Sequence, residues 1–169
     1  MFYFKLIRGS AVRSHCIGCT AGGSLTLDYR RRGSMKASSL SFQAAVLFVL
    51  AGMVWGLQMA ISNDHSAFPA HAHLNLVGFV SLFLFGFYYR MHPSLDQSRA
   101  AFAQVWIWIV GTIIMVIGVA LVHTGHAGGD PIAAIGSIIV LVGMLTFGWL
   151  LFRAERQMGS PSRSAVPAE

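Results

Sequence analysis

Charged side chains are scarce in this sequence and are missing from four long stretches. Asp, Glu, Lys and Arg together make up 11% of the residues, whereas hydrophobic residues make up 55%. The stretches without any of these four residue types are 42–62, 69–89, 100–122 and 131–152. Each is long enough to cross a hydrocarbon core of ~30 Å as an α-helix that rises ~1.5 Å per residue. This absence disfavours a soluble core, and we predict an all-α fold, a four-transmembrane-helix bundle.

Lysine and arginine are absent from one side of this predicted topology. All 12 lie before the first span, between the second and third, or after the fourth, so four crossings place them on one face. The positive-inside rule makes that face cytoplasmic, and we expect both termini there, in a bacterial inner membrane. Topology and anionic lipid then explain the net charge of +6, and no nucleic-acid partner is expected. We expect the same interface to hold aromatic residues near these span ends: Tyr88, Tyr89, Trp106, Trp108 and Trp149.

Cysteine occurs only twice, as Cys16 and Cys19 in HCIGCT. There is no second cysteine pair to complete a zinc site, and no histidine follows Cys19 to form a haem-attachment motif. On the predicted topology both thiols face a reducing cytoplasm, which disfavours a structural disulfide. We therefore assign this pair no function.

The sequence before the first span lacks a continuous apolar run. We predict that residues 1–41 are disordered or are a mis-assigned extension. The second alternative concerns residues 1–34, because Met35 begins MKASSLSFQAAVLFVL, an ordinary start for a membrane protein. No signal-peptide pattern is present in this segment. The predicted membrane domain is 42–153, and residues 154–169 are predicted to form a disordered tail.

The face without lysine or arginine carries most of the histidines. His65 lies in the first outer loop, His71 and His73 open the second span in PAHAHLN, and His123 and His126 close the third in HTGH. Adjacent spans run antiparallel, so these imidazoles are expected in one outer layer. A neutral imidazole is a ligand for haem iron, copper or zinc. We predict His71, His73 and His123 as cofactor ligands, and the same three with His126 as metal ligands.

Sequence spacing limits which of these side chains can share one ion. His71 and His73 differ by ~200° at ~100° per helical residue, so they point to nearly opposite faces. They would serve two sites, or one would face the bundle interior and the other a neighbouring subunit. Asn75 shares a face with His71 and is predicted either to orient this imidazole or to bond to another helix. His123 and His126 share a face only if the helix continues through the intervening glycine.

A simpler interpretation applies to histidines near helix ends, which often lie half-wetted in the headgroup region. We prefer this interpretation for His65, and for His126 we give it the same weight as a role as a ligand. It is weaker for His73 and His123, because an unpaired polar group nearer the hydrocarbon costs several kcal/mol. Small residues predict tight helix packing. Gly52 and Gly56 form a GxxxG surface in the first span, and two further pairs follow at heptad spacing, Gly111 with Gly118 in the third span and Gly136 with Gly143 in the fourth.

The second span, PAHAHLNLVGFVSLFLFGFYYRM, resembles the metal-ligand helices of haem-copper oxidase subunit I. The likeness is to the cbb-type branch and to small four-span proteins described as subunit I-like. It covers about residues 40–152 and rests on PAHAHLN and HTGH. The resemblance implies haem b as cofactor, with copper as the second candidate, and an H-x-H pair that serves two haems. The span tyrosines, Tyr88 and Tyr89, lie at the opposite end from the histidines, so oxygen reduction by this chain alone is not expected.

We therefore expect an integral membrane protein that binds haem, or else copper, and acts in electron transfer or haem handling. Besides the bilayer, a second copy of the chain and a redox protein are the expected partners. The alternative belongs to another class: a cofactor-free membrane protein whose histidines act as a proton relay or pH sensor. Sequence patterns leave open whether the protein is an enzyme and what its substrate would be.

Overall fold

The computed structural model describes residues 36–158, and every regular element in that range is helical. Four helical segments have the length and apolar composition needed to cross a membrane. The second of them is divided into three consecutive elements with a π-helix in the middle. The elements are α1 (Ala37–Ser62), α2 (Phe68–His73), η1 (Leu74–Val80), α3 (Ser81–Met91), the short α4 (Pro93–Asp96), α5 (Arg99–His123) and α6 (Gly129–Met158). The predicted four-span, all-α fold is confirmed.

Two helix ends differ from the predicted domain limits. Helix α1 begins at Ala37, earlier than the predicted boundary at residue 42, because the serines of its first turns belong to the core. Ser38 and Ser41 are fully buried. Helix α6 continues past residue 153 to Met158. The expectations for residues 1–34, for the Cys16 and Cys19 pair and for the end of the C-terminal tail lie outside the described residues.

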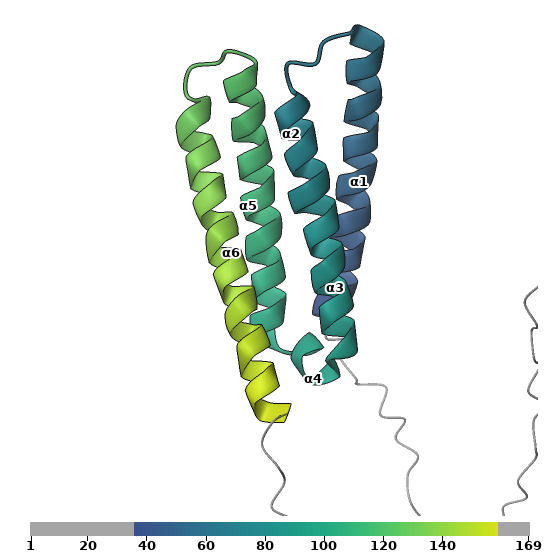
Figure 1. The fold of residues 1–169 in the computed structure, drawn as a ribbon, viewed down its shortest axis with the longest axis vertical. Helices are drawn as coiled ribbons and strands as arrows, with labels where there is room; N and C mark the ends of the chain where they lie inside the picture. Colours follow the sequence, from purple (N-terminus) through teal and green to yellow (C-terminus); the bar gives the residue numbers. More distant parts are fainter. Residues whose placement is uncertain (1–35, 159–169) are drawn as a thin grey trace, which may run out of the picture. The chain divides into compact units, whose positions relative to one another are not determined.

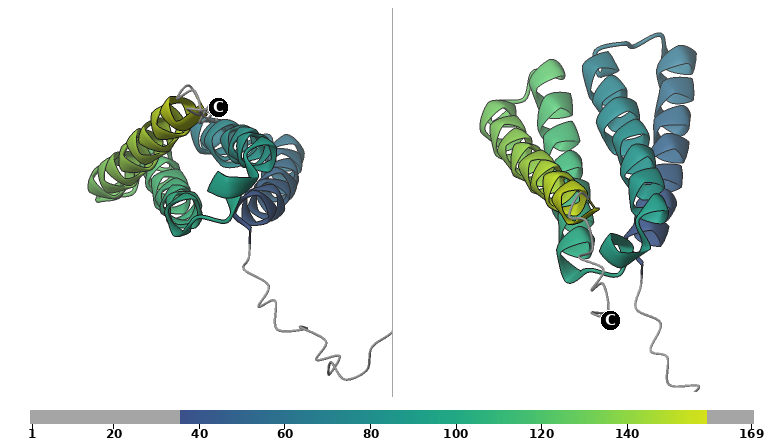
Figure 2. Two further views of the ribbon diagram at one scale, coloured as in Figure 1. Left: turned by 90° about the horizontal axis from the view of Figure 1, so that it is seen from below. Right: turned by 60° about the horizontal axis from the view of Figure 1, so that its bottom comes forward.

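The described helices form two antiparallel hairpins. Helix α1 packs along η1 and α3, and α5 packs along α6. Helix α5 also contacts α1, α2, η1 and α3, so it joins the two hairpins. Figure 1 shows the hairpins next to one another, and Figure 2 shows the short α4 where the chain passes from the second span to α5. This arrangement brings the start of the second span beside the end of α5.

Glycines set the close approach of α5 and α6. A side chain on Gly118 would overlap the backbone of Ala133, and one on Gly136 would overlap the backbone of Met115. A Cβ on Gly111 would lie 2.9 Å from the backbone nitrogen of Val140. Backbones this close allow extensive van der Waals contact, which drives association of helices in lipid. The predicted role of these glycines in tight packing is confirmed.

Buried polar side chains tie three spans together within the core. The Tyr89 hydroxyl donates to Gln104 Oε1 at 2.8 Å, and Gln104 Nε2 donates to the Gly143 carbonyl at 3.3 Å. Tyr89 and Gln104 are fully buried, and Trp108 is 3% exposed. The expectation that Tyr89 and Trp108 belong to an interfacial belt is therefore wrong. Their polar atoms find partners inside the protein instead.

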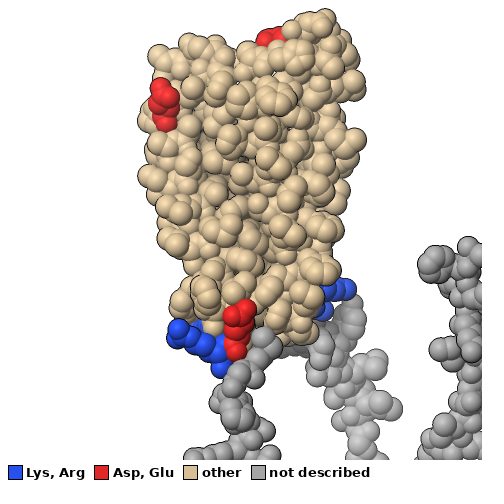
Figure 3. Space-filling view, viewed as in Figure 1, with Lys and Arg blue, Asp and Glu red and all other residues tan. Residues whose placement is uncertain are grey.

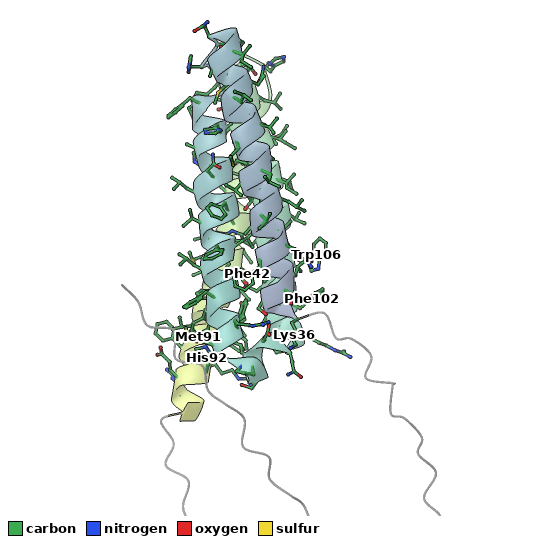
Figure 4. The ribbon with its side chains drawn as sticks, turned by 90° about the vertical axis from the view of Figure 1, so that its right-hand side faces the viewer. Lys36, Phe42, Met91, His92, Phe102 and Trp106 are labelled. Atoms are coloured by element: carbon green, nitrogen blue, oxygen red, sulfur yellow. The ribbon has the colours of Figure 1, made fainter. Side chains whose placement is uncertain are left out.

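Large apolar side chains cover the outer faces of the bundle, as expected for a surface in contact with lipid. Leu47, Val54, Ile61 and Leu145 are each more than 60% exposed. Figure 3 shows lysine and arginine gathered at one end of the described helices, with the long tan surface free of them. Figure 4 places Lys36 and His92 at that same end, where α1 begins and α3 ends.

Candidate functional site

The two ends of the bundle have different chemistry. We call one the cation end, because it holds the described lysine and arginine residues: Lys36, Arg90, Arg99, Arg153 and Arg156. We call the other the histidine end, because the α1–α2 and α5–α6 connections and the helix ends beside them carry His65, His71, His73, His123 and His126. The contact of α2 with α5 brings the two groups of histidines to one end of the bundle.

His71 enters the groove that two glycines open on α1. A Cβ built on Gly56 would lie 3.0 Å from His71 Cε1, and one on Gly52 would overlap the Asn75 side chain. The GxxxG surface of α1 thus receives two polar side chains one helical turn apart on the second span. The prediction that His71 and Asn75 share a face is confirmed.

The amide of Asn75 lies against the imidazole of His71. Asn75 Nδ2 lies 3.1 Å from the His71 carbonyl oxygen and 3.1 Å from its Nε2. It also lies 3.5 Å from Nδ1 of the same ring. An amide nitrogen only donates, so the carbonyl oxygen is its acceptor, whereas its contact with both ring nitrogens is not in line with either lone pair and does not select a tautomer of His71.

His73 and His123 are arranged in the opposite way. His73 Nδ1 lies 2.7 Å from the Pro69 carbonyl oxygen, and His123 Nδ1 lies 2.9 Å from the Val119 carbonyl oxygen. A carbonyl oxygen only accepts, so each Nδ1 carries the proton and each neutral ring has its lone pair on Nε2. A hydrogen bond from Nδ1 to a backbone carbonyl is also the support that metal-bound imidazoles use. His73 is half-buried and His123 is exposed.

His126 lies beyond the end of α5. The helix ends at His123, and Gly125 has a φ of 77°, so the shared helical face that would join His123 and His126 does not form. The Thr124 hydroxyl donates to the Ala120 carbonyl at 2.9 Å, and its oxygen lies 3.0 Å from His126 Nδ1. A hydroxyl can donate to the imidazole or accept from it, so this contact holds the His126 ring beside Thr124 without selecting its tautomer.

The same intrahelical bond occurs once at the cation end. His92 Nδ1 lies 2.8 Å from the Tyr88 carbonyl oxygen, and the His92 ring lies 4.3 Å from the Tyr88 ring, centroid to centroid. This bond is therefore a local property of a histidine near a helix end and does not by itself mark a ligand. His73 and His123 differ from His92 by their position at the end where histidines gather.

No preformed site for a single metal ion is found among residues 36–158. In that part of the chain, no three His, Cys, Asp or Glu side chains are placed to bind one ion. His71 and His73 are expected to serve separate sites, and the assignment of His71, His73, His123 and His126 as ligands stays a prediction. His71 is directed into the α1 groove, and His126 lies beyond the end of α5.

A π-helix follows the histidines directly and was not predicted from the sequence. Residues Leu74–Val80 form η1, and the Trp108 indole nitrogen of α5 donates to the Val77 carbonyl at 2.9 Å. Single π-turns leave backbone groups that need other partners and are frequent at functional sites. The pattern of apolar residues in the sequence does not indicate this change in the backbone hydrogen-bond register. The available signal was Trp108, whose indole nitrogen needs an acceptor in the middle of an apolar span.

The loop charges at the histidine end are negative. The backbone amide of Ser66 donates to Asp64 at 2.9 Å and holds the pKa of this carboxyl below its ordinary value. Asp130 lies in the first turn of α6, where the helix dipole favours a carboxylate. Among the described residues, lysine and arginine are confined to the other end.

Comparison with known proteins finds one partial match, and it is to the oxidase subunit that the second span resembles. The chain is 35% identical over 57 residues to cytochrome c oxidase subunit 1 of Thermus thermophilus, a match that covers 30% of this chain and 53% of that protein. The chain thus spans about half the length of the curated relative that it matches. No protein-family model matches the sequence, and no solved structure matches it significantly. These findings support a loose resemblance of a four-span membrane protein to cytochrome oxidase subunit 1.

Proposed function

We propose that this protein binds haem at its histidine end and acts in electron transfer or haem handling in the membrane. The observation that carries the proposal is the gathering of five histidines at one end of the bundle, where α2 contacts α5. Two of them, His73 and His123, are held through Nδ1 by a backbone carbonyl, so Nε2 of each ring is the atom that would bind iron. The partial similarity to cytochrome c oxidase subunit 1 supports the same chemistry.

Haem fits the histidine end better than copper or zinc does. A single zinc or copper ion usually takes three or more protein ligands, whereas haem iron needs only one or two axial ligands because the macrocycle supplies the rest. Residues 36–158 hold no three-residue ligand group, but His73 and His123 each offer one suitable nitrogen. Haem b is therefore the proposed cofactor, and copper is the second candidate.

The residues at this end would have distinct roles. His73 and His123, which lie on different elements, would hold the haem iron, and His73 is half-buried whereas His123 is exposed. An exposed ligand such as His123 suits a haem shared with a second copy of the chain or presented to a redox protein. His71 would position the second span through Asn75 and Gly56 rather than bind the iron. When bound, the haem would supply one-electron transfer.

The proposed orientation places the histidine end in the periplasm and the cation end in the cytoplasm of a bacterial inner membrane. Arginine and lysine resist translocation, and the described ones occupy one end. The test uses a variant without Cys16 and Cys19 that carries one new cysteine. Ser66→Cys and Ala127→Cys should react with a membrane-impermeant maleimide in intact spheroplasts, whereas Ser94→Cys should react only after lysis. The reverse pattern would overturn the orientation.

The absorption spectrum of the purified protein tests haem binding. Protein purified from haem-replete cells should show a Soret band, with separate α and β bands after reduction. His71→Ala should retain a haem signal, because the His71 ring lies against Gly56 in the α1 groove and is not proposed as a ligand. A colourless preparation of the folded protein would contradict the proposal.

The alternative is a cofactor-free protein whose histidines relay or sense protons. The contact of Asn75 with the His71 ring supports it, because protonation of the imidazole would place a positive charge beside an amide nitrogen that can only donate. In that case the protein would be colourless and metal-free.

A further inference from the structure

We propose that a cavity at the cation end is a binding site for the phosphate group of an anionic phospholipid. The cavity measures about 250 Å³ and lies between the α4–α5 connection and α6. Its polar lining comes from Arg153, Ser94 and Ser98, and its apolar lining includes Trp149 and Leu150. The volume is below the ~300 Å³ at which pockets for drug-sized ligands begin, so a headgroup fits and a large cofactor does not.

The polar lining is suited to an anion. Arg153 brings a permanent positive charge, and its guanidinium carbon lies 5.3 Å from the centroid of the Trp149 ring, which holds it beside the cavity. The Ser98 oxygen accepts a bond from the Ala101 amide at 3.1 Å, so its own hydroxyl proton is free to donate. No carboxylate is present in the lining formed by the described residues. Guanidinium and hydroxyl donors together match a phosphate group.

Asp96, the acidic residue beside the α4–α5 connection, does not pair with Arg153. Asp96 is 5% exposed and turns toward α1, where its two oxygens accept from the backbone amide of Ser38 at 2.7 Å and from its hydroxyl at 3.0 Å. The start of α5 adds the positive end of its helix dipole on the cavity side, since Ala100 is part of the lining. Glu155 lies two residues from Arg153 on α6 and carries a negative charge, but it is not part of the lining. The groups that line the cavity therefore favour a negative ligand.

The surface next to the cavity indicates a lipid rather than free phosphate. Trp149 is both a lining residue and 54% exposed. Leu145 and Phe152, four and three residues away on the same helical face, are 65% and 63% exposed. An acyl chain could lie along these side chains while its phosphate occupies the cavity. Free phosphate would gain nothing from this apolar surface.

Native mass spectrometry of the full chain in a neutral detergent tests the proposal. The detergent removes the membrane surface potential, so only site-bound lipid is counted. The probes are phosphatidylglycerol and phosphatidylcholine with identical acyl chains. We expect one phosphatidylglycerol per chain at low lipid ratios and at least about fivefold less phosphatidylcholine. Equal retention of the two lipids would overturn the proposal, and displacement of phosphatidylglycerol by millimolar inorganic phosphate would overturn its lipid part.

Two matched arginine variants locate the site. Arg153→Gln should lower phosphatidylglycerol retention by about fivefold or more, whereas Arg156→Gln, outside the cavity, should leave it within about twofold. Arg153→Lys keeps the charge but not the planar fork, and should give an intermediate value. Arg153 is exposed, so folding should be unaffected, which circular dichroism checks. Equal losses from the Arg153→Gln and Arg156→Gln variants would show general charge attraction and would contradict a site.

Discussion

The cation end and the histidine end use polar side chains in different ways. At the cation end, both oxygens of Asp96 are bonded to Ser38, and the Tyr89 hydroxyl is bonded to Gln104. These bonds join one element to another. At the histidine end, His73 and His123 bond to the carbonyls of their own helices and keep Nε2 available. The contrast indicates that polar groups hold the helices together at one end and offer ligands at the other.

The largest expected effect comes from the contact between α5 and α6, on which both ends depend. Gly118→Ala would drive a methyl group into the backbone of Ala133, and backbone cannot move aside as a side chain can. We expect the free energy of unfolding to fall by about 3 kcal/mol. Unfolding in mixed micelles with increasing sodium dodecyl sulfate measures this change.

Gly148→Ala is the matched control for that variant. It makes the same chemical change on α6, at a position where a Cβ meets nothing within 4 Å. A gain of up to about 1 kcal/mol is expected, because alanine is the better helix former. Similar losses from the two alanine variants would show that the α5–α6 contact is not set by Gly118.

The second largest loss of stability is expected at the start of α1. Asp96→Ala removes the carboxylate that caps the Ser38 amide and leaves the Ser38 hydroxyl without its acceptor. A loss of about 2 kcal/mol is expected, the upper range for a helix cap. The same detergent titration should show almost no loss for Asp130→Ala, since Asp130 is exposed in the first turn of α6. If the two aspartate variants behave alike, the buried cap does not stabilise the fold.

A smaller difference separates two neighbouring tyrosines. Tyr89→Phe leaves Gln104 Oε1 without its donor, and a hydrogen bond of this kind in a membrane protein contributes about 0.6–1.7 kcal/mol. Tyr88→Phe should cost nothing or stabilise slightly, because the Tyr88 hydroxyl is buried without a partner among the described residues. Comparing the two phenylalanine variants by unfolding measures the difference. An equal loss of stability in both variants would show that the hydrogen bond between Tyr89 and Gln104 does not stabilise the fold.

The span count was predictable from sequence because charge is excluded from lipid and marks each helix end. The polar contacts were not, since burial of Ser38 depends on Asp96, which lies on another element. The position of His71 likewise depends on how the second span packs against Gly56. Periodicity gave the face of His71 on its own helix but not the helix that it meets. The π-helix had no signal in the apolar pattern, because it is a change in backbone register.

The measurement that tests the central contrast most directly is the haem content per chain of three single alanine variants, determined by the pyridine haemochrome assay. His73, His123 and His92 all bond through Nδ1 to a carbonyl of their own helix, but only the first two lie at the histidine end. We predict that His73→Ala and His123→Ala each lose most of the haem, whereas His92→Ala retains the wild-type amount. Equal haem content in all three variants would contradict the assignment of ligands to the histidine end.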